Sequence, residues 1–237
     1  MKGLIIAGGA GTRLHPLTNP LNKHLLPVYD RPMIMHVIDT LVKGGVTDIM
    51  LLLNGKHAGL FMEMLEDGSS LGCKILYAYV RRTTGPGGTL LLAEHWVGKE
   101  DVAVILGDSV YFTLLALIGK KGPHIFTMKL QDGDDDPSKY GQVRVKGSRV
   151  TALVDKPKKR FSDLIQTACF IFPPDVFARV RKLQFSPDGE LTIGALVKEY
   201  VDEGSVTHTM LPPRSYIDCG TPEALHKASV RIRKMRR

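Results

Sequence analysis

Near its N-terminus the chain reads Leu4-Ile5-Ile6-Ala7-Gly8-Gly9-Ala10-Gly11-Thr12-Arg13-Leu14. The apolar residues predict a buried β-strand over residues 2–7, and the glycines directly after it predict a loop. Glycines let the main chain approach a ligand closely, and successive N–H groups in such a loop form a cradle for an anion. Arg13 adds a delocalised cation that suits phosphate oxygens. The stretch therefore predicts a strand that leads into a phosphate-binding loop.

Two familiar phosphate-binding motifs do not fit this loop. A Walker A loop ends in Gly-Lys-Ser/Thr, whereas this one ends in Gly11-Thr12-Arg13. In a dinucleotide-binding fingerprint Leu14 would have to be glycine, and Pro16 argues against a long helix here. A tight surface turn is the simpler alternative, but it leaves Thr12, Arg13 and the later Lys23 without explanation.

Strands and helices alternate through the first half of the chain. Strands are predicted over 48–53, 74–80 and 101–106, and helices over 32–43, 58–65 and 88–96. Such alternation indicates a mostly parallel sheet covered by helices on both sides.

The second half is richer in strands. They are predicted over 124–129, 142–145, 150–154, 167–172 and 205–210, with a hairpin turn at 147–148, an exposed acidic loop at 132–138, and helices over 173–182, over 191–201 and from Pro222. The predicted fold class is α/β: a Rossmann-like mixed, mostly parallel sheet flanked by helices, with a small β-rich region inserted. The sequence predicts one domain over residues 1–237.

Composition narrows the class of protein. The 237 residues are 43% hydrophobic, but no apolar run approaches the roughly 20 residues that cross a bilayer. We therefore expect a cytoplasmic location and no membrane partner. The three cysteines, Cys73, Cys169 and Cys219, lack metal-ligand spacing, so we expect reduced core residues.

The formal net charge of +8 favours anionic partners, which are nucleic acids or phosphorylated small molecules. Much of it gathers at the C-terminus, in Arg231, Arg233, Lys234, Arg236 and Arg237. No aromatic residues interleave this run and no nucleic-acid module is visible, so a solvated helix end is the favoured interpretation over a nucleic-acid partner.

Two aspartates follow predicted strands. Asp108 ends a buried apolar run, and Asp218 follows Tyr216-Ile217. Open α/β sheets bind ligands at the carboxyl ends of their strands, and carboxylates suit a divalent metal. Alternatively, each aspartate caps the next turn or helix.

Larger blocks of sequence resemble a known family. Gly8 to Thr18, followed by Lys23-His24-Leu25-Leu26-Pro27 and Arg31-Pro32-Met33-Ile34, resembles the opening signature of sugar nucleotidyltransferases, and among them the glucose-1-phosphate thymidylyltransferases. The resemblance implies transfer of a nucleotidyl group from a nucleoside triphosphate, with dTTP or UTP favoured, to a sugar 1-phosphate. It also implies that the base and phosphates are wrapped by Gly8, Gly9, Gly11 and Thr12, and that Arg13 and Lys23 are catalytic cations.

Further segments extend the resemblance. Leu106-Gly107-Asp108 and Asp218-Cys219-Gly220-Thr221 look like the two metal-binding segments of the family, which implies that Asp108 and Asp218 bind Mg²⁺. Val154-Asp155-Lys156-Pro157 resembles the Glu-Lys-Pro motif, so Lys156 would be a catalytic residue that contacts the sugar phosphate in a β-rich sugar-binding region. Gly189-Glu190-Leu191 resembles a sugar-site segment and makes Glu190 a candidate for sugar hydroxyls, although an exposed glutamate at a helix start accounts for it equally well.

Two departures leave the substrates open. Thymidylyltransferases read the base with a glutamine, and no glutamine occurs over residues 79–89, where Gly85 and Gly88 instead offer backbone that could approach base or ribose. Ala168 stands where a sugar-contacting glycine is usual. The sequence leaves open whether the protein forms a homo-oligomer. It also leaves open an alternative function, a non-catalytic nucleotide or nucleotide-sugar sensor of the same fold.

Overall fold

The computed structural model describes residues 1–9, 11–55, 57–81, 84–130, 136, 139–186 and 189–236. The chain divides into two compact units, each assembled from separate stretches of sequence. Unit 1 comprises residues 1–82, 105–118 and 216–237, and unit 2 comprises residues 83–104 and 119–215. The prediction of a single domain over 1–237 stays a prediction.

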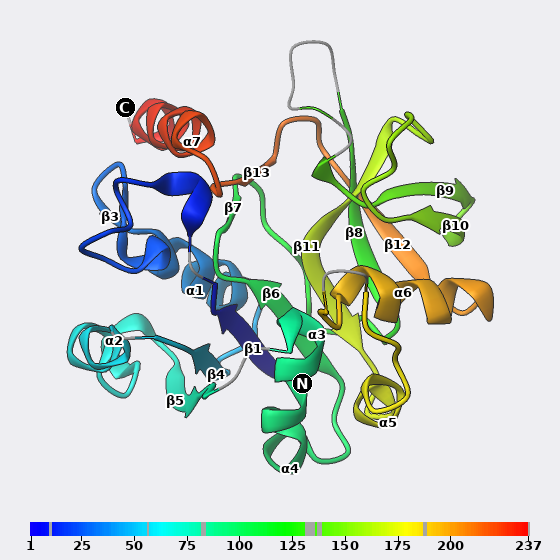
Figure 1. Ribbon diagram of the computed structural model, residues 1–237, viewed down its shortest axis with the longest axis horizontal. Coiled ribbons are helices and arrows are strands. Elements are labelled where there is room, and N and C mark those ends of the chain that lie inside the picture. The colour runs from blue at the N-terminus through cyan, green and yellow to red at the C-terminus, as the bar shows by residue number, and fades with distance from the viewer. Residues whose placement is uncertain are drawn as a thin grey trace. The chain divides into compact units, whose positions relative to one another are not determined.

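Unit 1 contains most of the predicted parallel sheet. Its strands are β1 (Lys2–Ala7), β2 (Pro27–Val28), β3 (Arg31–Pro32), β4 (Asp48–Leu53), β5 (Lys74–Tyr79), β7 (Ser109–Tyr111) and β13 (Tyr216–Asp218). Its helices are α1 (Met33–Lys43), α2 (Ala58–Leu65) and α7 (Pro222–Met235), with short 3₁₀ turns η1 (Thr12–Leu14), η2 (Lys23–Leu25) and η3 (Ser69–Leu71). β4 pairs in parallel with β1 on one side and with β5 on the other, as Figure 1 shows.

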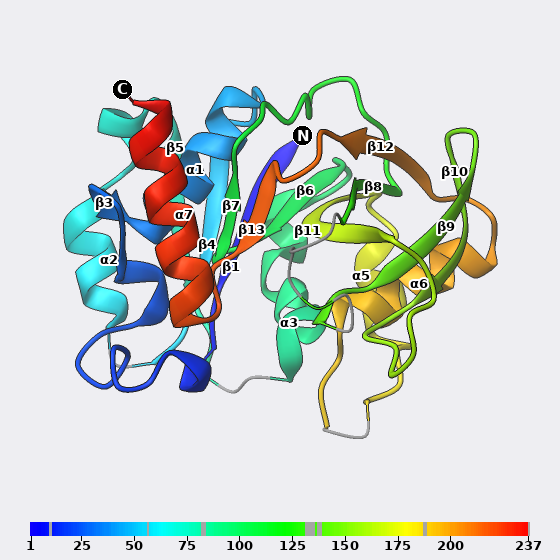
Figure 2. The same cartoon turned by 90° about the horizontal axis from the view of Figure 1, so that it is seen from above.

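Apolar burial explains these elements. β1 and β4 are continuous apolar runs whose side chains are buried after the first residue of each strand, as expected for strands covered on both faces. In α1 the predicted helical spacing is confirmed, because Met33, Val37 and Leu41 are all fully buried. Near the C-terminus, α7 lies beside β13 (Figure 2) and contributes Ala228 and Ile232 to a cluster with Val110 and Cys219.

The β7–β13 ribbon positions the candidate metal ligands. The two short strands pair antiparallel, which places Asp218 opposite Ser109, the residue after Asp108. The amide of Cys219 donates to the Asp108 carbonyl at 2.8 Å. Two aspartates that lie 110 positions apart in the sequence thereby share one stretch of backbone pairing.

Unit 2 holds the strands β8 (His124–Lys129), β9 (Gln142–Lys146), β10 (Arg149–Val154), β11 (Leu164–Phe172) and β12 (Thr207–Leu211), and β6 (Val102–Leu106) begins in it. Its helices are α3 (Gly85–Thr89), α4 (Glu94–Val97), α5 (Val176–Val180) and α6 (Ile193–Asp202), with the 3₁₀ turn η4 (Leu90–Ala93). β9 and β10 form the predicted hairpin, in which Gly147 has φ 58°. β12 runs parallel to β8, and Figure 1 shows the two side by side.

The mixed α/β sheet is confirmed, but a mostly parallel sheet describes unit 1 rather than unit 2. In unit 2, β11 pairs antiparallel with β8 and β9, and β10 pairs antiparallel with β9 and β12. The expectation came from strand–helix alternation, which ends where the second half supplies hairpins instead of crossover helices.

Other boundaries differ for local reasons. The helix predicted over 88–96 is three short segments, α3, η4 and α4, since glycine is a poor helix former and α3 contains Gly85, Gly87 and Gly88. The helix predicted from 173 begins only at Val176, after the turn at Pro173-Pro174. β11 begins at Leu164, three residues before its predicted start. Most of the acidic loop at 132–138 lies outside the described residues.

Two expectations concern the environment of the chain. Cys73, Cys169 and Cys219 are buried and free, as predicted. Within the described ranges, none of the helices has both the length and the apolar character to span a bilayer.

Candidate active site

The glycine loop after β1 has the backbone that only glycine adopts readily. Gly9 has φ 114° and Gly11 has φ 65°, both in the left-handed region. The hydroxyl of Thr18 donates to the Gly11 carbonyl at 2.8 Å and fixes the turn before η1. Beside the loop lies Lys23, whose Nζ is 3.7 Å from the position that a Cβ on Gly9 would take.

Lys23 and Asp108 form the central ion pair of unit 1. Lys23 Nζ lies 2.5 Å from Asp108 Oδ2, and the two side chains are only 13% and 12% exposed. Burial on its own would raise the pKa of Asp108, but the charge of Lys23 and its hydrogen bond outweigh burial and lower that pKa to about 2. Asp108 is therefore ionised at any physiological pH.

His24 and Asn22 hold Lys23 in place. Asn22 caps η2, because its Oδ1 accepts from the His24 amide at 3.0 Å and lies 2.8 Å from His24 Nδ1. The His24 ring is 1% exposed and packs against Gly107, where an added Cβ would lie 2.8 Å from the ring. Burial, and then the charge of Lys23, lower the pKa of His24 to about 3, so the ring is neutral. The sequence analysis assigned no role to Asn22 or His24.

Asp218 and Arg13 complete the cluster. Asp218 Oδ1 accepts from the Gly220 amide at 2.9 Å, and the Arg13 guanidinium lies over Gly220, with Nη2 2.6 Å from the position of an added Cβ. Burial, and then the charge of Asp108, raise the pKa of Asp218 to about 6, while the charge of Arg13 opposes this rise. The structure thus brings Arg13, Lys23, Asp108 and Asp218 together within unit 1.

The pair of carboxylates fits a magnesium ion. Asp108 and Asp218 repel each other through a buried region, and a divalent cation would relieve that repulsion. Among the residues that the structure describes, no group of three or more His, Cys, Asp or Glu side chains could hold a metal. A site with only two carboxylates suits Mg²⁺, which binds through one or two carboxylates and takes its other ligands from water and substrate phosphates.

In unit 2, Lys156 has an uncommon backbone conformation and a backbone hydrogen bond to a neighbouring segment. It has φ 45°, an uncommon value for a residue with a side chain, and such strain gathers at functional sites. Its amide donates to the Tyr140 carbonyl at 3.2 Å, which ties the end of β10 to the segment before β9. The preceding Asp155 lies against Gly194 in the first turn of α6, with Cγ 2.6 Å from where a Cβ would stand.

Gly85, Gly88 and Glu190 also come together in unit 2. The Leu191 amide donates to the Thr84 carbonyl at 2.7 Å, and Gly85 has φ 81° and leaves no room for a Cβ against Glu190. An added Cβ on Gly88 would lie 2.0 Å from the Thr84 hydroxyl. These glycines have a packing role in the structure, while their contact with base or ribose stays a prediction. Glu190 is exposed.

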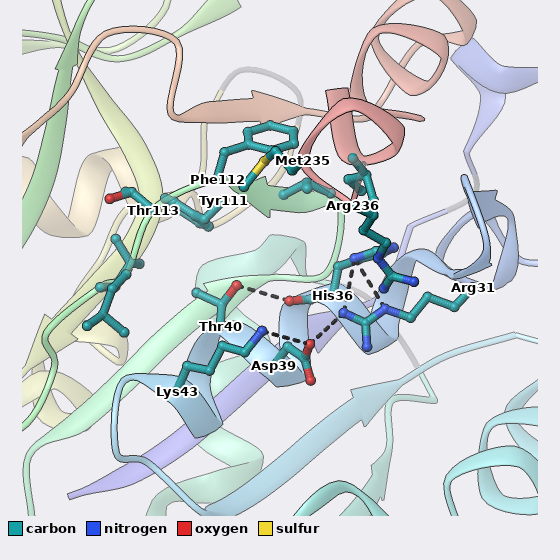
Figure 3. A pocket seen from close by; sticks show the side chains of 14 residues that line it. Arg31, His36, Asp39, Thr40, Lys43, Tyr111, Phe112, Thr113, Met235 and Arg236 are labelled. Carbon is teal, nitrogen blue, oxygen red and sulfur yellow. Dashed lines mark hydrogen bonds and ion pairs between the residues drawn. The ribbon is translucent and has the colours of Figure 1, made fainter. Parts of the chain in front are cut away.

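A separate cavity of about 380 Å³ lies in unit 1 among α1, β7 and α7 (Figure 3). Its lining includes Asp39, which pairs with Arg31 at 2.5 Å and with Lys43 at 3.3 Å. Arg236, also in the lining, pairs with Asp30. None of the predicted site residues lines this cavity, so it is distinct from the charged cluster.

Comparisons with known proteins agree with the geometry. A family model described as nucleotidyl transferase matches residues 2–235. Glucose-1-phosphate thymidylyltransferase from Neisseria meningitidis serogroup A is 32% identical over 238 residues, covering 97% of this chain and 81% of the relative. The enzyme of that name from Mycobacterium tuberculosis is 31% identical over 100% of this chain and 84% of its own length.

Solved structures show the same likeness. A Bacillus anthracis protein described as a glucose-1-phosphate thymidylyltransferase, in complex with sucrose, superposes with a TM-score of 0.89 at 30% identity over 98% of this chain and 95% of its own. A UDP-glucose pyrophosphorylase complexed with UDP-glucose has a TM-score of 0.81 at 20% identity over 99% and 98% of the two chains, and it supports the fold. The chain belongs to the nucleotidyl transferase family.

Proposed function

We propose that this protein joins a nucleoside triphosphate to a sugar 1-phosphate, releasing pyrophosphate and leaving a nucleotide sugar. The observation that carries this proposal is the cluster of Arg13, Lys23, Asp108 and Asp218 beside the glycine loop, in which Lys23 pairs with the buried Asp108. Relatives of about one-third identity over nearly the whole chain are named glucose-1-phosphate thymidylyltransferase. On that basis dTTP or UTP is the favoured triphosphate, and glucose 1-phosphate is the first acceptor to test.

The reaction needs no nucleophile from the protein, since the attacking phosphate is already anionic. An oxygen of the sugar phosphate forms a bond to the α-phosphorus, and the bond from that phosphorus to the oxygen bridging to the β-phosphate breaks. Pyrophosphate leaves with the electron pair. Catalysis then depends on positioning and on stabilising negative charge. Arg13 and Lys23 would stabilise charge on the triphosphate, and Lys156 would hold the sugar phosphate.

Asp108 and Asp218 would hold Mg²⁺, which when bound neutralises charge on the phosphates. Lys23 keeps Asp108 ionised, which is the form that binds a cation. We also place the reaction in the cytoplasm. Three buried free cysteines support this location, because thiols persist in a reducing compartment.

A non-catalytic sensor of nucleotides or nucleotide sugars remains the competing proposal, since residues 79–89 lack a base-reading glutamine. The relatives reported above carry the names of enzymes, which favours catalysis. The presence or absence of turnover separates the two functions.

The decisive experiment measures pyrophosphate release with Mg²⁺ over a grid of nucleoside triphosphates and sugar 1-phosphates. We expect release for at least one pair, dependent on both substrates and abolished by chelating the metal. If folded protein binds a nucleotide but releases no pyrophosphate with any pair of substrates, the sensor function is favoured.

A further inference from the structure

Unit 2 contains a buried polar group that none of the residues described by the structure satisfies. Gln166 lies on β11 and is 8% exposed, and its Oε1 has no hydrogen-bond partner among the described residues. Burying a carbonyl oxygen without a donor destabilises a fold, so such an oxygen in a native structure calls for an explanation.

A second buried glutamine, 24 positions earlier, provides the contrast. Gln142 on β9 is fully buried, and its Oε1 accepts from the amides of Phe161 at 2.7 Å and Ser162 at 2.9 Å. Its side chain is explained by structure alone. The same strand region therefore satisfies the side-chain carbonyl oxygen of one buried glutamine and leaves that of the other without a partner among the described residues.

The Gln166 amide lies against the backbone of Gly141. A Cβ on Gly141 would stand 2.4 Å from Nε2 and 2.8 Å from Cδ of Gln166, so only glycine leaves the amide in this place. The backbone N–H of Gln166 donates to the Gly141 carbonyl at 2.8 Å. Side chain and backbone of Gln166 are thus both fixed against one residue.

Gly141 adjoins the residue that anchors Lys156. On one side of Gly141, the carbonyl of Tyr140 accepts from the backbone amide of Lys156. On the other side, Gln142 pairs with Val154 on β10 and with Ile165 on β11. The end of β10, the beginning of β9 and the first half of β11 therefore meet at one junction. Lys156 and Gln166 both belong to it.

We propose that Gln166 is a specificity-determining residue whose Oε1 accepts a hydrogen bond from a ring hydroxyl of the sugar 1-phosphate. This inference rests on the proposed function, in which Lys156 holds the phosphate of the same substrate. A sugar ring offers several O–H donors at short range from its phosphate, whereas a carbonyl oxygen repels an anion. The ligand would supply the donor that is missing among the described residues.

The test compares Gln166→Leu with wild type, using the sugar 1-phosphate identified on the grid and each of its monodeoxy analogues. A neutral hydrogen bond corresponds to about a tenfold change in kcat/KM. We expect the variant to lose about tenfold on the parent sugar phosphate, and one deoxy analogue to react equally with both proteins. KM for the triphosphate should stay within about twofold.

Thermal unfolding separates this role from packing. Gln166→Leu should keep or raise Tm because it removes an unsatisfied buried acceptor, whereas the control Gln142→Leu should lower Tm because it orphans two amides. Gln166→Met serves in the same assays if the leucine variant does not fold. Unchanged kcat/KM on every sugar, equal losses on all deoxy analogues, or a change confined to the triphosphate KM would each overturn the proposal.

Failure of the proposed function gives a different signature. If wild type releases no pyrophosphate on any pair, calorimetric binding of glucose 1-phosphate to wild type and Gln166→Leu decides the inference. Weaker binding by the variant supports it. Equal affinity, or no binding to either protein, overturns it.

Discussion

The charged cluster of unit 1 and Gln166 of unit 2 differ in how their polar groups are paired. In unit 1 the candidate catalytic charges lie next to one another, with Lys23 2.5 Å from the buried Asp108, and with the exposed Arg13 acting on Asp218. In unit 2 a neutral acceptor, Gln166 Oε1, is buried with no partner in the described part of the chain.

This difference follows from the cost of burial. A buried charge without a partner costs far more than a buried neutral oxygen, so charges must be paired within the protein before substrate arrives. A single unsatisfied carbonyl oxygen lowers stability only a little, and it can accept a hydrogen bond from the ligand. Changes to the charged cluster of unit 1 should therefore damage both turnover and stability, and changes at Lys156 or Gln166 in unit 2 should act mainly on the use of the sugar phosphate.

The largest effect should come from Asp108→Asn. The change removes a metal-ligand candidate and leaves Lys23 buried without its counter-charge. We expect pyrophosphate release to fall by about 10³-fold and the free energy of unfolding to fall by about 3 kcal/mol in urea titration. The control is Asp39→Asn, which breaks the ion pair with Arg31 in the separate cavity and should leave turnover near wild type. Full turnover in Asp108→Asn would remove this residue from the mechanism.

Sequence patterns predicted the charged cluster because its members sit in motifs at strand ends and in a glycine loop. The β7–β13 pairing that joins Asp108 to Asp218 spans 110 positions, and only the family resemblance linked them beforehand. A continuous apolar run predicted β4 with its observed bounds, because burial on both faces leaves a plain signal, and the strand-like residues 124–129 predicted the bounds of β8.

What could not be predicted depends on side-chain contacts. The Asn22–His24 contact and the packing of His24 on Gly107 have no periodic signature, although an Asn directly before Lys-His is a weak signal for a cap. Gln166 looks like an ordinary polar residue in a strand until its burial is known. The antiparallel character of unit 2 was missed because short apolar runs do not specify strand direction.

Lys156→Met should have the second largest effect and confine it to one substrate. The lysine follows β10 with a strained backbone and carries the charge proposed for the sugar phosphate. We expect kcat/KM for the sugar 1-phosphate to fall by about 10²-fold, while KM for the triphosphate stays within about twofold. Lys158→Met, an exposed neighbour, is the matched control. Equal losses for both substrates would mean that the two units do not divide the work in this way.

Gly141→Ala tests the packing around Gln166. The new Cβ would stand 2.4 Å from Gln166 Nε2, which must then shift. We expect about a tenfold rise in KM for the sugar phosphate and a stability loss of about 1–3 kcal/mol. The double variant Gly141→Ala with Gln166→Ala should recover part of the lost stability, whereas its KM for the sugar phosphate should stay high because the accepting oxygen is gone. Gly59→Ala, where no atom lies within 4 Å of the added Cβ, should instead be neutral or stabilising. A double variant no more stable than Gly141→Ala would show that the added methyl group does not clash with Gln166.

The smallest effect should come from Asn22→Ala, which leaves every charge of the cluster in place and removes only the cap that holds η2. Its Oδ1 satisfies the His24 amide and contacts the ring nitrogen, so its loss should lower the free energy of unfolding by about 1 kcal/mol. Because Lys23 begins η2, KM for the triphosphate should rise about threefold, and KM for the sugar phosphate should not change. Asn22→Asp keeps an acceptor at the cap and should recover most of the stability. If alanine lowers stability without moving the triphosphate KM, the cap serves folding alone, and the ordering of Lys23 must come from Asp108 itself.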